Sequence, residues 1–276
     1  MSERHDHGSR PTLVVGPSGG RQGCRAPGAT GRVGSGDWPG ANSRPVGPLV
    51  PTIGDVRTTA RYDSYARWYD ERLTPFAQRA TPFIRAWLGP GPGRCLELGC
   101  GGGLHLPAVA EAGWFVVGVD ISADQLAIAR QRRHVGRLVQ ADVAAVPFAD
   151  GSFDAVYAAF IHTDVDDWSA AAAQAGRAVR PGGRVLYVGT HPCFVGPFSR
   201  YPGQAPPRLF PGYRRMHRTY VGPGLGDGLR RRVGVRHVPL ATLLNALLRA
   251  GLWLEHVDEP GPEDYPRLLA LSATRP

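Results

Sequence analysis

Apolar strands that alternate with helices constrain the fold of this chain more than any other feature of its sequence. The predicted strands of this region span 94–98, 114–119, 137–140, 153–160 and 183–189. The predicted helices between them span about 103–112, 123–134 and 166–179. Most of these strands are apolar along their whole length, and a strand of this kind followed by a helix is typical of a parallel sheet covered on both faces.

The segments on either side complete the predicted domain. Aromatic and apolar residues recur at helical spacing over 62–76, and a second helix is expected over 79–88. After residue 237 we predict a helix over 239–250 and strands over 252–257 and 267–273. Their connection is too short for a helix, so the two strands form an antiparallel hairpin. The prediction is an α/β Rossmann-like fold with a mostly parallel seven-stranded sheet, helices on both faces and added N-terminal helices.

Two stretches do not fit the alternation. Residues 1–55 are rich in Gly, Pro, Ser and Arg, bury too little apolar surface to fold, and are predicted to be a disordered tail before a domain at 56–276. Residues 190–237 are a basic, aromatic insertion, with nine arginines against one acid between 200 and 237. We predict that this insertion caps an acceptor site, where rings and guanidinium groups hold an aromatic or anionic molecule. A solvated, proline-rich loop is the alternative.

The composition excludes several classes of protein. No apolar run is long enough to cross a bilayer, and the first 20 residues lack the apolar core of a signal peptide. We therefore expect a cytoplasmic protein without a membrane span. The four cysteines have no ligand-like spacing, so we expect reduced thiols and no metal site.

The stretch "LELGCGGGL" at 96–104 predicts a nucleotide-binding turn between a strand and a helix. Leu104 stands where the dinucleotide fingerprint has its last glycine. Glu97, two residues before Gly99, is unfavourable beside a pyrophosphate and suits a ligand that carries an ammonium group. Asp120 follows about twenty residues later, where a carboxylate binds ribose hydroxyls. The expected ligand is a nucleoside with a ribose and a cation but no phosphate.

S-adenosylmethionine fits this description, and four ordered motifs resemble the class I S-adenosylmethionine-dependent methyltransferases. They are "LELGCGGG", "VVGVDIS", "QADVAAVPFADGSFDAVYAAF" and "AGRAVRPGGRVLYVG". The resemblance covers roughly 60–190 well and 238–273 loosely, and points to the small-molecule branch that includes ubiquinone-type methyltransferases. It implies transfer of a methyl group to oxygen, nitrogen or carbon of a small organic acceptor by in-line displacement.

The resemblance also implies which residues bind the cofactor. The implied set is Tyr62, Tyr69, Glu97, Gly99, Cys100, Gly101, Asp120, Ile121, Asp142, Val143 and Phe160. In this set Asp120 binds the ribose, Asp142 accepts from the adenine amino group and Phe160 lies near the sulfonium. Tyr62 and Tyr69 are lid contacts or, equally, core residues of a helix face.

Three histidines are candidates for a catalytic base, which a hydroxyl acceptor would need. His162 follows the fourth strand, His191 follows the fifth, and His237 ends the insertion. Ligands bind outside the carboxyl ends of strands in such sheets, which places the first two near the reaction. His191 precedes a proline, so a turn residue is the alternative there.

Three other functions remain open from the sequence. An RNA methyltransferase would use the basic insertion to bind phosphates, although the domain balances its charges elsewhere and no nucleic-acid partner is expected. A non-catalytic S-adenosylmethionine-binding protein would lack a methylated product. A nicotinamide-dependent reductase conflicts with Glu97 and Leu104. The sequence gives no indication of the oligomeric state.

Overall fold

The computed structural model describes residues 60–132, 136–202, 205–226, 228 and 230–276. The expected tail over residues 1–55 lies outside these ranges, and so does the end of the helix predicted over 123–134.

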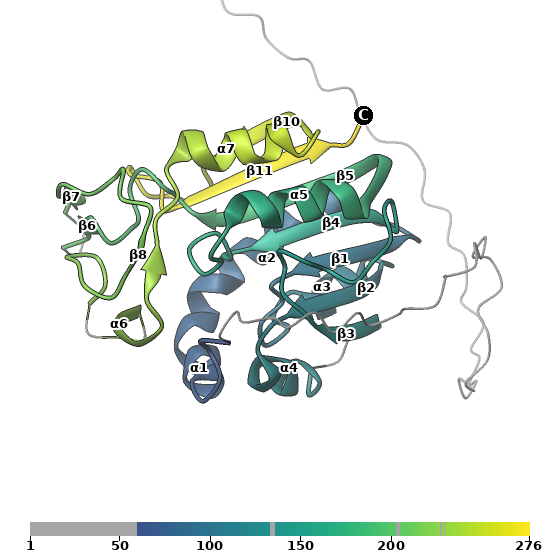
Figure 1. Cartoon of the computed structure of the whole chain (residues 1–276), viewed down its shortest axis with the longest axis horizontal. Helices are drawn as coiled ribbons and strands as arrows, with labels where there is room; N and C mark the ends of the chain where they lie inside the picture. The colour runs from purple at the N-terminus through teal and green to yellow at the C-terminus, as the bar shows by residue number, and fades with distance from the viewer. Residues whose placement is uncertain (1–59, 133–135, 203–204, 227, 229) are drawn as a thin grey trace, which may run out of the picture. The chain divides into compact units, whose positions relative to one another are not determined.

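A seven-stranded sheet forms the centre of the described chain (Figure 1). The strands lie in the order β10-β11-β5-β4-β1-β2-β3. The first five in sequence are β1 (Arg94–Leu98), β2 (Phe115–Asp120), β3 (Gly136–Gln140), β4 (Phe153–Ala159) and β5 (Val179–Thr190). They pair in parallel, whereas β11 (Leu268–Thr274) runs antiparallel to both β5 and β10 (Trp253–Asp258). The predicted fold class and its antiparallel C-terminal hairpin are confirmed.

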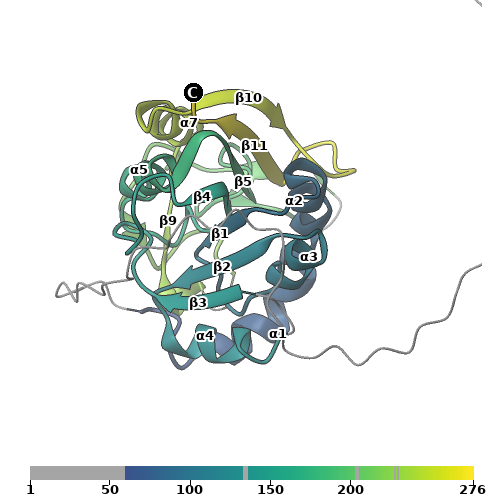
Figure 2. The ribbon, with the colours of Figure 1, turned by 90° about the vertical axis from the view of Figure 1, so that its right-hand side faces the viewer.

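Helices cover both faces of this sheet (Figure 2). On one face lie α5 (Trp168–Ala178) and α7 (Leu240–Arg249). On the other lie α2 (Thr81–Leu88), α3 (Leu106–Glu111) and α4 (Ala123–Ala129). Successive side chains of a strand point to opposite faces of the sheet, so the core has two layers. In β2, Val117 packs in the layer of α5 and α7, and Val116 packs in the layer of α2, α3 and α4.

Two helices begin later than the sequence predicts, because residues with positive φ precede them. The helix expected from 62 begins as α1 (Ala66–Ala77) and continues into a short 3₁₀ turn over Gln78–Ala80. Ser64, with φ +67°, breaks the helical path before it. The helix expected from about 103 begins only at Leu106, since Gly103 has φ +74°.

The 190–237 insertion forms small elements that the sequence did not predict. They are β6 (Ser199–Arg200), β7 (Arg208–Leu209), β8 (Arg218–Thr219), α6 (Arg230–Val233) and β9 (Val235–Arg236). β6 pairs with β7 and β8 with β9, both antiparallel. In Figure 1 the labelled β6, β7, β8 and α6 gather at one end of the sheet.

Within the described ranges, no helix has the length and apolar character needed to span a bilayer. The described cysteines, Cys95, Cys100 and Cys193, are free thiols. The described residues contain no group of three metal-ligating side chains.

Candidate functional site

A cavity with an open volume of about 820 Å³ lies at the carboxyl ends of β1, β2 and β4. This position is where open α/β sheets bind their ligands. Nine of the eleven predicted cofactor residues lie on its wall. They are Tyr62, Tyr69, Gly99, Gly101, Asp120, Ile121, Asp142, Val143 and Phe160. The sequence therefore identified most of one continuous surface from segments far apart in the chain.

The glycine turn after β1 shapes one side of this cavity. Gly99 has φ +69°, and a Cβ atom built on it would lie 2.4 Å from Cγ2 of Ile161. A side chain at this position would meet both a strained backbone and a steric clash. Glycine is thus required here for the turn and for close packing against the loop that follows β4.

Asp120 is held rigidly at the end of β2. One carboxylate oxygen, Oδ2, accepts a hydrogen bond of 2.8 Å from the backbone N–H of Gly101, and Oδ1 accepts one of 2.9 Å from that of Ser122. Burial raises the pKa of Asp120 to about 6, although the two backbone hydrogen bonds act in the opposite direction. Each oxygen keeps further acceptor capacity, so the fixed carboxylate can accept two adjacent hydroxyl groups.

Gln125 adds an acceptor that the sequence analysis missed. This residue of α4 is 3% exposed and lines the cavity, and its amide oxygen has no hydrogen-bond partner among the described residues. An acceptor buried without a partner is unfavourable, so this oxygen is suited to a ligand donor. Only its place three residues after Ser122, the helix N-cap, could have suggested that it faces the turn.

Glu97 and Cys100 are the two predicted cofactor residues that the structure does not bring to the cavity wall. Glu97 lies on β1 and is 1% exposed, and its carboxylate accepts a hydrogen bond of 2.8 Å from the Tyr157 hydroxyl. The Cys100 side chain packs against Gly118 of β2. Strand alternation explains the difference for Glu97. Its side chain lies on the same face of β1 as Cys95, in the core layer between the sheet and α2, α3 and α4.

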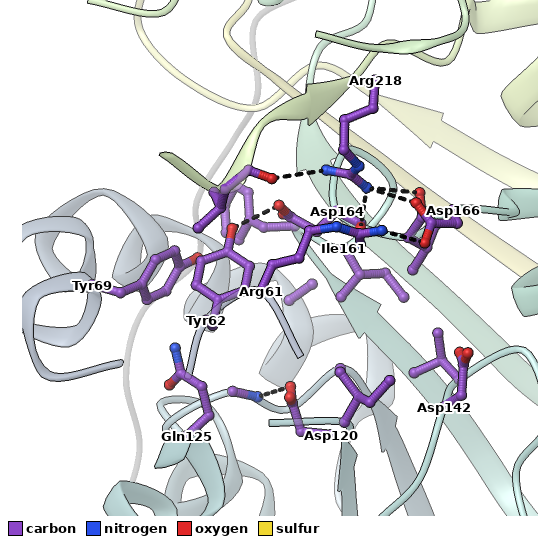
Figure 3. Close-up of a pocket in the computed structure, with 18 residues that line it drawn as sticks. Arg61, Tyr62, Tyr69, Asp120, Gln125, Asp142, Ile161, Asp164, Asp166 and Arg218 are labelled. Atoms are coloured by element: carbon purple, nitrogen blue, oxygen red, sulfur yellow. Dashed lines mark hydrogen bonds and ion pairs between the residues drawn. The ribbon is translucent and has the colours of Figure 1, made fainter. Parts of the chain in front are cut away.

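The loop after β4 closes the opposite side of the cavity, again with residues that sequence reasoning did not assign (Figure 3). Asp164 accepts a hydrogen bond of 2.6 Å from the Tyr62 hydroxyl and forms an ion pair with Arg230 of α6. Burial alone would lower the pKa of Arg230, but the Asp164 carboxylate raises it above its usual range. Burial also raises the pKa of Tyr69 to about 12 and that of Tyr62 well above its usual value, so both tyrosines stay neutral.

A parallel arrangement surrounds Asp166. Its carboxylate pairs with Arg61 on one side and with Arg218 of β8 at 3.2 Å on the other. Figure 3 shows Arg61, Arg218 and both aspartates on the same side of the cavity. Asp164 and Asp166 therefore join the segment before α1 to the insertion. Of the three acids in the 164–167 run, only Asp167 serves as the N-cap of α5, the role that an acidic run before a helix suggests.

None of the three candidate histidines lines this cavity. His191 has both ring nitrogens engaged: Nε2 lies 2.7 Å from Glu259, and Nδ1 accepts from the backbone N–H of Cys193. These contacts fix a turn after β5 and leave His191 no nitrogen for a substrate. These contacts support the turn-residue alternative for His191.

His162 and His237 are buried and differ from His191 in one respect. The Nε2 atom of each has no hydrogen-bond partner among the described residues. The Nδ1 atom of His162 lies 2.5 Å from the Tyr187 hydroxyl. Burial lowers the pKa of His162 to about 3 and that of His237 to about 4, so both rings are neutral at physiological pH.

Comparisons with known proteins agree with this geometry. A family profile described as "Methyltransferase domain" matches residues 96–187. The chain is 37% identical over 148 residues to a demethylmenaquinone methyltransferase of Renibacterium salmoninarum, a match that covers 50% of this chain and 61% of that relative. It is 35% identical over 157 residues to the protein of the same name from Mycobacterium sp. (strain KMS), covering 54% and 67%.

The fold also matches a solved structure. The S-adenosylmethionine-dependent methyltransferase from Mesorhizobium loti superimposes with a TM-score of 0.61 at 27% identity, over 71% of this chain and 98% of that one. The sequence matches thus cover about three fifths to two thirds of the relatives' length, whereas the structural match spans nearly all of its counterpart.

Proposed function

The chain belongs to the class I small-molecule S-adenosylmethionine-dependent methyltransferases, and we propose that it methylates a quinone-like or phenolic acceptor. S-adenosylmethionine is the cofactor of this family. The observation that supports cofactor binding is the fixed Asp120 carboxylate inside a cavity lined by the predicted motif residues, and the names of the relatives support the acceptor class.

The donor set of the cavity fits this cofactor. Asp120 offers two carboxylate oxygens for the ribose hydroxyls, and the unpartnered Gln125 oxygen offers an acceptor beside the glycine turn. We assign to Gln125 the contact with the cofactor's ammonium group that Glu97 was expected to make. Ile121, Asp142 and Val143 would contact the adenine at the other end.

Phe160 marks the proposed reacting end. It is a non-glycine residue with φ +59°, and its backbone N–H donates a hydrogen bond of 2.8 Å to Val188 of β5. A non-glycine residue with its backbone in this left-handed region costs about 1–3 kcal/mol, and such strain is typical of functional sites. We propose that the strained turn places the Phe160 ring against the sulfonium.

The chemistry depends mainly on alignment. S-adenosylmethionine, when bound, supplies an electrophilic methyl carbon on a positively charged sulfur. The protein has to hold the acceptor in line with that carbon, and positioning of this kind can contribute about 7–11 kcal/mol to lowering the barrier. Tyr62 and Tyr69 on one side and the 164–166 loop on the other would exclude water.

We propose His162 as the residue that orients or deprotonates an acceptor hydroxyl. Its Nδ1 atom is engaged by Tyr187, which leaves Nε2 for the acceptor. If the Tyr187 hydroxyl donates, Nε2 carries the proton and orients the acceptor oxygen; in the other tautomer Nε2 is the base. His237, whose Nε2 is also unpartnered, is the second candidate for this contact.

The 190–237 insertion is the proposed cap over the acceptor. Its arginines reach the cofactor side through Asp164 and Asp166, and the ring of Phe198 packs 4.8 Å from that of His237. The relatives named for demethylmenaquinone support a quinone-like acceptor and give no support to the RNA alternative.

Two measurements test the proposal. Calorimetry should detect binding of S-adenosylmethionine and no binding of NADH, which separates a methyltransferase from a reductase. Labelled methyl groups should then pass from the cofactor to demethylmenaquinone or a phenolic analogue and not to RNA. Tight cofactor binding without transfer to any small-molecule extract would favour the non-catalytic alternative and overturn the proposal.

A further inference from the structure

A second cavity lies at the carboxyl end of β5, beside the start of β11, and has no role in the site described above. Its open volume is about 980 Å³. The wall combines rings, prolines and one guanidinium group, and includes Tyr201, Pro206, Pro207, Pro262, Tyr265 and Arg267. The rings and prolines offer flat apolar surfaces to an aromatic ligand, and the polar groups among them can bind its oxygen.

Arg267 is held between two aromatic rings in this cavity. Its guanidinium carbon lies 4.7 Å from the ring centroid of Tyr201 and 5.7 Å from that of Phe76 in α1. Stacking fixes the plane of the group and directs its N–H donors outward from the rings.

Two polar atoms at this place lack a partner. The Nε atom of Arg267 and the hydroxyl of Tyr201 are both buried, and neither has a hydrogen-bond partner among the described residues. Burial raises the pKa of Tyr201, so its hydroxyl remains a donor. Unsatisfied donors on two side chains in contact are unfavourable for the protein alone and complementary to an oxygen acceptor on a ligand.

The nearby carboxylates do not cancel this donor pair. Two acids, Glu263 and Asp264, lie on the cavity wall near Arg267. Arg79 donates hydrogen bonds to both carboxylate oxygens of Glu263, at 2.7 and 2.9 Å, and so neutralises its charge. With Asp264 included, the two arginines and two acids balance. The cavity therefore suits an oxygen-bearing aromatic ring better than a multiply charged anion.

The Phe76 ring lies between this cavity and the cofactor site. Its ring centroid lies 5.5 Å from that of Phe160, which lines the cofactor cavity, and 5.7 Å from the Arg267 guanidinium. The two cavities have no lining residue in common among the described residues, so the second is a separate site.

We propose that Arg267 and Tyr201 bind the oxygen of an aromatic ligand in this second cavity, apart from the cofactor site. Since neither atom reaches solvent in this conformation, the ligand engages them through a side-chain adjustment of the kind common on binding.

The test uses the full chain and three probes: 2-naphthol, 2-naphthoate and naphthalene. Binding is followed by saturation-transfer NMR and calorimetry in wild type, Arg267→Gln, Tyr201→Phe and the exposed-surface control Arg249→Gln. Both oxygenated probes should bind wild type and the control alike and more tightly than naphthalene. Loss of a hydrogen bond to the charged group should weaken them about tenfold in Arg267→Gln.

Affinity for S-adenosylmethionine should stay within about twofold in every variant, and it also reports that the fold is intact. Failure of the oxygenated probes to bind wild type, equal affinity for naphthalene, or unchanged affinity in both Arg267→Gln and Tyr201→Phe would each overturn the assignment. If the probes bind as expected but S-adenosylmethionine does not, the binding site stands and the proposed function fails.

Discussion

The Tyr157 hydroxyl on β4 donates a hydrogen bond of 2.8 Å to the carboxylate of Glu97 on the neighbouring strand β1. Both side chains are 1% exposed. Burial raises the pKa of Glu97 from 4.5 to about 8, although the hydrogen bond from Tyr157 lowers it. The acid that the sequence suggested for cofactor recognition is thus a mostly protonated group inside the sheet at neutral pH.

The first prediction follows from this raised pKa. The folded state keeps the Glu97 proton up to about pH 8, whereas the unfolded chain releases it near 4.5. The resulting stability is complete below 4.5 and is lost as the pH rises toward 8, with a slope of at most about 1.4 kcal/mol per pH unit. Glu97→Gln should remove this slope.

Urea denaturation of both proteins between pH 5 and 8 measures the effect. The stability of the variant relative to wild type should increase with pH across this window. Identical pH dependence in the two proteins would show that Glu97 ionises normally in the folded state.

The second prediction concerns Asp120. Asp120→Asn keeps the shape but removes the charge that ribose hydroxyls would meet, and loss of charge-assisted hydrogen bonds should weaken S-adenosylmethionine binding by about tenfold or more. Because the pKa of Asp120 is about 6, wild-type affinity should also fall as the pH drops below 6, and the variant should show no such fall.

Calorimetry at pH 5 to 8 checks both effects. Asp150→Asn, a change at a carboxylate that is 71% exposed, is the control and should bind like wild type. Unchanged affinity in Asp120→Asn would remove the ribose assignment.

The main fold was predictable because its signals are local. Apolar strands and their turns are encoded in consecutive residues, so β1 was placed at its observed bounds and β2 within a residue. The small elements of the insertion, such as β6 and β8, have two residues each and carry no periodic signal.

Much of the cavity wall was predictable for a similar reason, since Gly99, Asp120 and Asp142 each belong to a local motif. Which face Glu97 points to depends on the packing of β1 against β4, which a motif does not encode. The pairing of Asp164 with Arg230 joins residues 66 positions apart and could not be deduced from composition.

The third prediction tests this pairing. Asp164→Asn leaves the Arg230 guanidinium without its counter-charge and should destabilise the protein by about 2 kcal/mol, less than for a fully buried pair because about a quarter of the Arg230 side chain is exposed. Tyr62→Phe removes the 2.6 Å hydrogen bond to Asp164 and the 3.0 Å hydrogen bond from Arg230, and should cost about 1–2 kcal/mol.

Thermal unfolding with and without S-adenosylmethionine distinguishes the roles of the two residues. If they close the cofactor cavity, both variants should also gain less stability from the cofactor than wild type does. An equal gain in all three proteins would restrict the network to a structural role.

The fourth prediction concerns the hydrogen bond of 2.5 Å between the Tyr187 hydroxyl and Nδ1 of His162. We expect Tyr187 to act as a positioning residue that fixes the His162 tautomer, so His162→Gln should lower kcat by about tenfold to a hundredfold, and Tyr187→Phe should lower it less. Because the two act through one contact, the double variant should be no slower than His162→Gln alone. Affinity for S-adenosylmethionine should not change in any of them, and Trp253→Phe, at an exposed side chain of β10, should retain wild-type kcat. Additive losses in the double variant would mean that Tyr187 does not act through His162. Wild-type kcat in His162→Gln would transfer the acceptor contact to His237. Its Nε2 atom is the other buried imidazole nitrogen without a partner among the described residues.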